Sequence, residues 1–131
     1  MSGLTIEGES LKAILKWPEH YFDDLVLIDS PIVLHIGSAE VLGQFCVKNN
    51  ELLVELAQID GGGEGVLPVI SRVAKRIAKL KSISTIHCIV HAVNCAQPNL
   101  KLRAHLLKTG FEVKEVPEKG IAFFKTIVLS D

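Results

Sequence analysis

The most informative segment of the chain is ELLVELAQIDGGGEGVLPVISRVAKRIAKL, residues 51–80. Its first part is mostly aliphatic, which is typical of a buried strand, and we place that strand at Glu51–Ile59. The last part carries apolar residues at spacings of three and four, which predicts an amphipathic helix over Val66–Leu80. Pro68 falls in the first turn of this helix, where a missing N–H group does no harm.

Between that strand and helix lie four glycines in the five residues 61–65. Glycine loses more backbone entropy on folding than any other residue, so such a loop needs a reason. It lets a ligand approach the main chain, and the next helix offers unpaired N–H groups and the positive end of its dipole, which suit phosphate. The spacing fits neither the Walker loop nor the dinucleotide fingerprint. A surface loop without a ligand is the alternative.

Towards the N-terminus, short segments rich in Val, Leu and Ile alternate with turn residues. We place strands at Leu25–Ile28, Pro31–Ile36 and Ala39–Lys48, ahead of the strand already described. Asn49-Asn50 suits a two-residue hairpin turn, because Asn tolerates positive φ. Together these segments predict an antiparallel meander.

The N-terminal region is expected to be helical. Residues 10–17 have the pattern of a short helix with Ser10 as its cap and Pro18 as its stop, and a further turn extends to Asp24.

After the central helix, the chain alternates strand and helix and then ends in two strands. The elements expected there are a buried strand, a helix closed by Gly110, and two strands joined by a turn at 117–120: Ile83–Ala92, Asn99–Thr109, Phe111–Val116 and Ile121–Leu129. The two last strands form either a hairpin or a pair that flanks another strand. The expected fold class is α+β, or mixed α/β, with residues 1–131 as one domain and a central, mostly antiparallel sheet flanked by helices.

Composition excludes several classes of protein. With 48% hydrophobic and 22% charged residues, the chain has too much apolar surface for a disordered protein. No apolar run approaches the ~20 residues of a membrane span, and no signal peptide is visible, so we expect no membrane association and a cytoplasmic location. The three cysteines show no C-x-x-C spacing, which excludes a disulfide scaffold and indicates small buried hydrophobes.

The charge is distributed unevenly. Residues 1–65 carry 3 Lys and 11 acids, hence −8, whereas residues 66–131 carry 11 basic and 4 acidic residues, hence +7. The net charge of −1 argues against nucleic-acid binding, which needs a positive field over the whole domain. The two halves either neutralise each other by packing or present separate ligand regions.

The order strand, glycine loop, helix, buried strand, with Asn99 eleven residues before Gly110-Phe111, resembles the GNAT superfamily of N-acetyltransferases. The resemblance covers Glu51 to the C-terminus. Gly63-Glu64-Gly65 matches the Gly-x-Gly of the family's loop, which holds the coenzyme A pyrophosphate, while Asp60 replaces the usual Gln or Arg and Leu106 replaces a Tyr that protonates the thiolate. The resemblance implies acetyl-coenzyme A as co-substrate and assigns it these residues: Ile59, Asp60, Gly61, Gly62, Gly63, Glu64, Gly65, Val66 and Asn99.

The implied reaction is attack of an amine on the thioester, which needs a base near the end of the strand at Glu51–Ile59. Glu55 and His91 are the candidates, with His87 behind them. His87, Ile89 and His91 share one face of the expected strand. A packing histidine and an outward-facing glutamate are the alternatives. Metal ligation by His87, His91 and Cys95 is not expected, because the β-branched run indicates a strand and no further ligand is evident.

The sequence thus predicts an N-acyltransferase whose acceptor is a small-molecule or peptide amine. The rival interpretation is a catalytically silent GNAT-fold module that binds acyl-coenzyme A or a protein partner. A third is a structural homodimer that uses the two oppositely charged surfaces.

Overall fold

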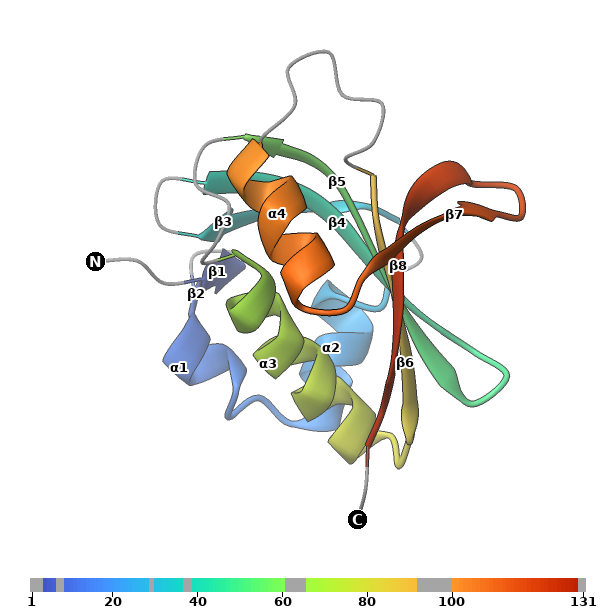
Figure 1. Cartoon of the computed structure of the whole chain (residues 1–131). Coiled ribbons are helices and arrows are strands. Elements are labelled where there is room, and N and C mark those ends of the chain that lie inside the picture. The colour runs from blue at the N-terminus through green and yellow to red at the C-terminus, as the bar shows by residue number, and fades with distance from the viewer. Residues whose placement is uncertain are drawn as a thin grey trace.

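The computed structural model describes residues 4–6, 9–28, 30–36, 39–60, 66–91 and 100–129. Its strands form one eight-stranded sheet in the order β2-β1-β3-β4-β5-β6-β8-β7 (Figure 1). The strands are β1 (Leu4–Ile6), β2 (Glu9–Ser10), β3 (Ile32–Ile36), β4 (Ala39–Lys48), β5 (Glu51–Asp60), β6 (Thr85–Val90), β7 (Glu112–Val116) and β8 (Gly120–Val128). The helices are α1 (Leu11–Ile14), α2 (Glu19–Leu25), α3 (Val66–Leu80) and α4 (Leu100–Lys108). The expected α+β class with a mostly antiparallel sheet is confirmed.

The predicted meander is present as β3, β4 and β5, each antiparallel to the next. Asn49 and Asn50 join β4 to β5 with φ values of 52° and 61°. Both residues therefore adopt the left-handed conformation that a two-residue hairpin turn requires. The turn and both flanking strands agree with the sequence-based expectation.

The parallel pair β5–β6 joins the meander to the rest of the sheet. Its register runs from Leu52 opposite Ile86 to Leu56 opposite Val90, and α3 provides the crossover between the two strands. The C-terminal strands pair with each other as a hairpin, and β8 also pairs antiparallel with β6. The alternative in which these last two strands flank another element is therefore wrong.

The segment Leu25–Ile28 is not the strand that the sequence predicted. Leu25 is the last residue of α2, and the backbone N–H groups of Val26 and Leu27 both donate to the carbonyl oxygen of Phe22, at 2.9 and 2.7 Å. Phe22 and Val26 are both buried, four residues apart. The apolar residues here thus follow a helical spacing, not the alternation of a strand.

The N-terminal helix also differs from its prediction. Glu9–Ser10 forms β2, so α1 is confined to the four residues Leu11–Ile14, and the expected further turn is the separate seven-residue helix α2. Tertiary packing sets these limits, because Ile14 and Trp17 are both buried in the main core.

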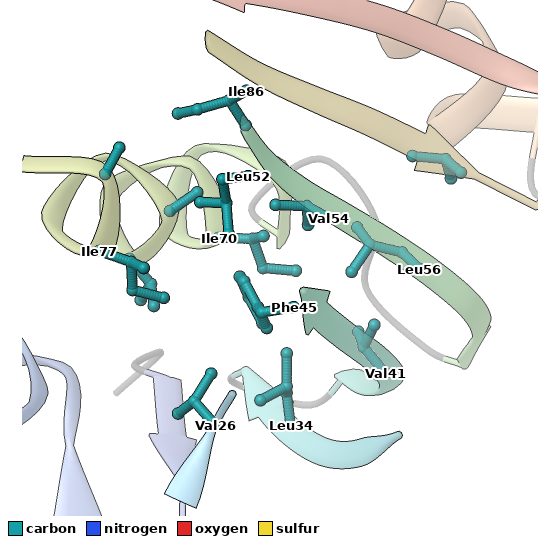
Figure 2. Close-up of a cluster of buried hydrophobic side chains, with 14 of the residues drawn as sticks. Val26, Leu34, Val41, Phe45, Leu52, Val54, Leu56, Ile70, Ile77 and Ile86 are labelled. Atoms are coloured by element: carbon teal, nitrogen blue, oxygen red, sulfur yellow. The ribbon is translucent and has the colours of Figure 1, made fainter. Parts of the chain in front are cut away.

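The main core lies between one face of the sheet and the helices. Each of the four helices contributes at least one buried side chain to this core. Helices α3 and α4 lie across the same face of the sheet (Figure 1). Figure 2 shows the centre of this cluster, where residues of α3, the meander and β6 meet Val26, which follows α2: Val26, Leu34, Val41, Phe45, Leu52, Val54, Leu56, Ile70, Ile77 and Ile86. A second, smaller cluster contains strand residues alone, Ile89, Val116 and Ala122, with Leu53 and Phe124 packed against it.

Candidate active site

The alternation of side chains along β5 and β6 places the two predicted catalytic residues on the same face of the sheet. Leu56 and Val90 belong to the main core beneath the helices. Their chain neighbours Glu55 and His91 therefore point to the opposite face, which carries the smaller cluster around Ile89. The expected grouping of side chains along the buried strand is confirmed.

Glu55 and His91 are in direct contact. The Nε2 atom of His91 lies 2.7 Å from Oε2 of Glu55. The side chain of His91 is 25% exposed and that of Glu55 is 19% exposed, so the pair is largely shielded from bulk water but can still be reached from solvent. In the described part of the chain, these two candidates are brought together as a pair and neither is an isolated surface residue.

A third residue, Lys119, completes the cluster from the turn between β7 and β8. Its Nζ atom donates to Oε1 of Glu55 at 2.9 Å. Each carboxylate oxygen of Glu55 thus has its own nitrogen partner. Lys119 was not among the residues predicted from the sequence, because 64 residues separate it from Glu55 and three strands must pair before they meet. The sequence evidence that pointed towards Lys119 was the turn at Pro117–Gly120. This turn predicted a hairpin but not where the tip of the hairpin would lie.

These contacts decide the protonation of Glu55. Burial raises its pKa, but the hydrogen bonds from Lys119 and His91 and the charges of both groups outweigh that effect, so the pKa is lowered from its ordinary value of 4.5. Glu55 is therefore a carboxylate near neutral pH and an acceptor for the N–H at Nε2 of His91. A neutral imidazole that donates from Nε2 carries its basic lone pair on Nδ1. Of the two predicted bases, Glu55 is the less suited to take a proton, because its lowered pKa favours the carboxylate.

A second histidine pair stands four residues earlier on the same strands. His87 contacts Oε2 of Glu51 through Nε2 at 3.0 Å and Oγ1 of Thr126 through Nδ1 at 3.0 Å. Its ring also stacks on Phe124 with ring centroids 5.8 Å apart. Both ring nitrogens of His87 are engaged by protein groups, which is typical of a structural histidine. His87 serves as a control for His91 because it lies on the same strand and the same face.

Within the described residues, β5 extends further than its pairing with β6. That described pairing ends with the His91 N–H donating to the Leu56 carbonyl oxygen at 2.9 Å, and β5 continues to Asp60 beside β4. The register with β4 shifts here: Leu42 faces Ala57, but Glu40 faces Asp60. β5 thus has one residue more than β4 in this interval, a β-bulge of the kind that redirects backbone groups near functional sites.

An apolar cavity of about 180 Å³ lies on the helix side of the same strands. Leu56 and Val90 contribute to its wall, so Glu55 and His91 adjoin it through the backbone. The other lining residues come from β5, α3, β6, β8 and the end of α4: Val54, Leu67, Pro68, Ile70, Ser71, Ala74, Cys88, Thr109, Phe111, Lys125 and Ile127. The Nζ atom of Lys125 donates to the carbonyl oxygen of Thr109 at 2.6 Å and is engaged at the rim.

Several of the residues assigned to coenzyme A lie outside the described residues: Gly61, Gly62, Gly63, Glu64, Gly65 and Asn99. Ile59 and Asp60 end β5 and Val66 begins α3, so the backbone flanks the loop as expected. Leu106 is fully buried in the main core. Cys46 and Cys88 are half-buried cysteines that form no disulfide within the described residues, and Cys95 lies outside those residues.

Across the described ranges, no three His, Cys, Asp or Glu residues are placed to hold a metal ion. None of the described helices is long and apolar enough to cross a membrane. In comparisons with known proteins, no family model matches the chain and no curated protein matches it.

Proposed function

We propose that the chain is an acetyl-coenzyme A-dependent N-acyltransferase with the GNAT fold, which transfers an acetyl group to an amine by direct attack on the thioester. The observation that carries the proposal is the Glu55–His91 pair at the end of the described β5–β6 pairing, with an apolar cavity on the other face of the same strands. The family resemblance expects the thioester to lie where these two strands part.

The cavity supports the assignment of the acyl donor. Its wall is mostly aliphatic and is shared by the start of α3 and the end of α4, near Pro68 and Phe111. The resemblance places the pantetheine arm beside the helix that ends at Gly110-Phe111 and the pyrophosphate at the glycine loop before α3. The methylene segments and methyl groups of the arm suit an apolar wall, and the start of a helix is a site where main-chain N–H groups bind phosphate.

The proposed chemistry uses the cluster around Glu55. The Nδ1 atom of His91 accepts a proton from the acceptor's ammonium group, and Glu55 stabilises the imidazolium through Nε2. The amine lone pair then attacks the carbonyl carbon, whose oxygen is polarised by a backbone N–H near the end of β5. The C–N bond forms and the C–S bond breaks, so that the coenzyme A thiolate leaves. The new amide nitrogen gives up its second proton to water, and water delivers a proton to the thiolate.

The test combines binding with turnover. Calorimetric titration with acetyl-coenzyme A and desulfo-coenzyme A measures affinity, and amine-dependent thiol release over a panel of amines measures the reaction. We expect His91→Ala to lower the rate at least about tenfold, since a positioned base contributes ~10²–10⁴. His87→Ala is the matched control, from the same strand and face, and should leave the rate within about twofold. Equal losses in both variants would contradict the assignment of His91.

One observation favours the second candidate function, a silent module that binds an acyl-coenzyme A. Leu106 replaces the Tyr of the resemblance and is fully buried in the main core, so α4 presents no acid there to the leaving thiolate. Under this proposal, the wild-type chain binds acetyl-coenzyme A but releases no thiol with any amine. No binding of either coenzyme A compound at millimolar concentration would refute both proposals.

A further inference from the structure

The turn between β7 and β8 reaches across to the candidate active site. Glu118 and Gly120 both have positive φ, 66° and 85°, and they turn the backbone so that Lys119 faces β5. The distance from Nζ of Lys119 to Oε1 of Glu55 is 2.9 Å. Because Lys119 is 37% exposed at its side chain, this contact is a partly shielded ion pair.

The tip of this hairpin is held in place by apolar packing and not by the ion pair alone. Val116 and Ala122, which flank the turn, are buried against Ile89 of β6 in the smaller cluster. The backbone N–H of Lys119 also donates to the carbonyl oxygen of Val116 at 2.9 Å. The turn is thus packed against this face of the sheet. This packing fixes the backbone from which the Lys119 side chain extends.

We infer that Lys119 is a positioning residue for His91: it holds one oxygen of Glu55, so that the other is aimed at Nε2 of His91 and the basic nitrogen is Nδ1. The catalytic meaning of this inference rests on the proposed function. The positioning itself is a property of the free protein and can be measured without any substrate.

The groups that face Glu55 come from three directions. His91 lies on one side on β6, Lys119 approaches from the turn, and Gln44, which is uncharged, stands opposite on β4. Of the charged groups in the described residues, Lys119 and His91 are the two that act on this carboxyl. Removing Lys119 therefore leaves Oε1 without its cation, lets the carboxylate rotate and makes its protonation easier.

The experiment compares Lys119→Met with Lys119→Arg, which keeps the charge, and with Lys114→Met, which removes a lysine of the same hairpin that packs over Phe124 instead. Carbon-13 NMR follows the Glu55 carboxyl through a pH titration, and nitrogen-15 NMR reports which ring nitrogen of His91 bears the proton. We expect Lys119→Met to move the Glu55 titration to higher pH by about half a unit or more and to increase the Nδ1–H tautomer. Lys119→Arg and Lys114→Met should keep the wild-type values.

Kinetics supply the second readout. In Lys119→Met, kcat should fall several-fold, and the loss should grow as the pH falls towards the raised Glu55 titration, while the KM for acetyl-coenzyme A stays within about twofold. Circular dichroism of each variant checks that the sheet is intact. An unmoved Glu55 titration, or failure of Lys119→Arg to restore it, overturns the role of Lys119. Absence of thiol release in the wild-type chain would refute the proposed function but not the positioning role of Lys119. The NMR titrations alone would then decide that role.

Discussion

At the scale of single residues, the lowered pKa of Glu55 couples the candidate site to the stability of the fold. The folded state favours the carboxylate, because Lys119 and His91 bind it, whereas the unfolded chain has the ordinary pKa near 4.5. The stabilisation is present above the unfolded value and is lost as the pH falls through the lower, folded value. Glu55→Gln should therefore lower the free energy of unfolding by about 1–3 kcal/mol at pH 7 and by much less at pH 3.

Urea unfolding of wild type and variant at the two pH values measures this difference. Glu51→Gln is the matched control, because its side chain also contacts a histidine on β6 but is 44% exposed, so we expect a change below about 1 kcal/mol. A Glu55→Gln deficit that is equal at pH 7 and pH 3 would show that packing, and not the ionised carboxylate, is responsible.

The thiol of Cys88 makes a second prediction at this scale. Burial raises its pKa to about 11, and the nearby Lys125 offsets only part of that effect. At pH 8 the thiolate is scarce, so iodoacetamide should alkylate Cys88 at least about tenfold more slowly than it alkylates glutathione. Mass spectrometry of the peptide that contains Cys88 gives the rate, and 8 M urea should abolish the protection. Alkylation of the folded protein at the rate of glutathione would contradict the burial of this thiol.

At the scale of elements, the β4–β5 turn makes the clearest prediction. Asn49 and Asn50 both have positive φ, a conformation that glycine adopts without steric cost. Asn50→Gly should raise the free energy of unfolding by about 0.5 kcal/mol, and Asn50→Val should lower it by about 1–2 kcal/mol. Thermal unfolding, followed by circular dichroism, ranks the stability of the wild type and the two variants. A stable Asn50→Val variant would mean that the turn does not hold the left-handed conformation.

The elements that the sequence predicted well are those whose own residues carry the signal. The helix Val66–Leu80 matches α3 because its apolar spacing persists over several turns, and Ala39–Lys48 matches β4 because turn residues bound it. The prediction of a strand at Leu25–Ile28 was wrong, because a short apolar run fits a strand as well as the end of a helix. Packing around Phe22 determines which of the two forms. Similarly, strand alternation grouped His87, Ile89 and His91 on one face of their strand. The contact of His91 with Glu55, however, depends on the β5–β6 register, and the contact of Lys119 with Glu55 depends on the bend of a distant hairpin.

At the scale of the whole molecule, ion pairs join the acidic and the basic half of the chain. Lys81, after α3, contacts Glu19 at 2.9 Å and Asp23 at 2.6 Å on α2, and these contacts raise its pKa. The contacts of Glu55 with Lys119 and His91 likewise connect the halves. Part of the charge asymmetry is therefore neutralised within one chain, as the packing interpretation of the sequence expected.

Lys81→Met tests this coupling. The lysine side chain is 21% exposed and its partners are about half exposed, so we expect a loss of about 1 kcal/mol in the free energy of unfolding at low salt. At 0.5 M NaCl the difference between variant and wild type should shrink, because salt screens exposed charges. A difference that does not depend on salt would point to lost packing of the lysine stem against its neighbours.

The parallel pairing of β5 with β6 also constrains the order of folding. The meander β3–β4–β5 and the hairpin β7–β8 each close over short loops, whereas β5 meets β6 only after the whole of α3 has crossed over. Contacts distant in sequence form late, because the entropy of closing the intervening loop must be overcome first. Glu55 lies on β5 and His91 directly follows β6, so their contact forms only when these two strands pair. Under the proposed function, thiol release in refolding experiments should therefore return with the structural phase in which β5 pairs with β6 and never ahead of it.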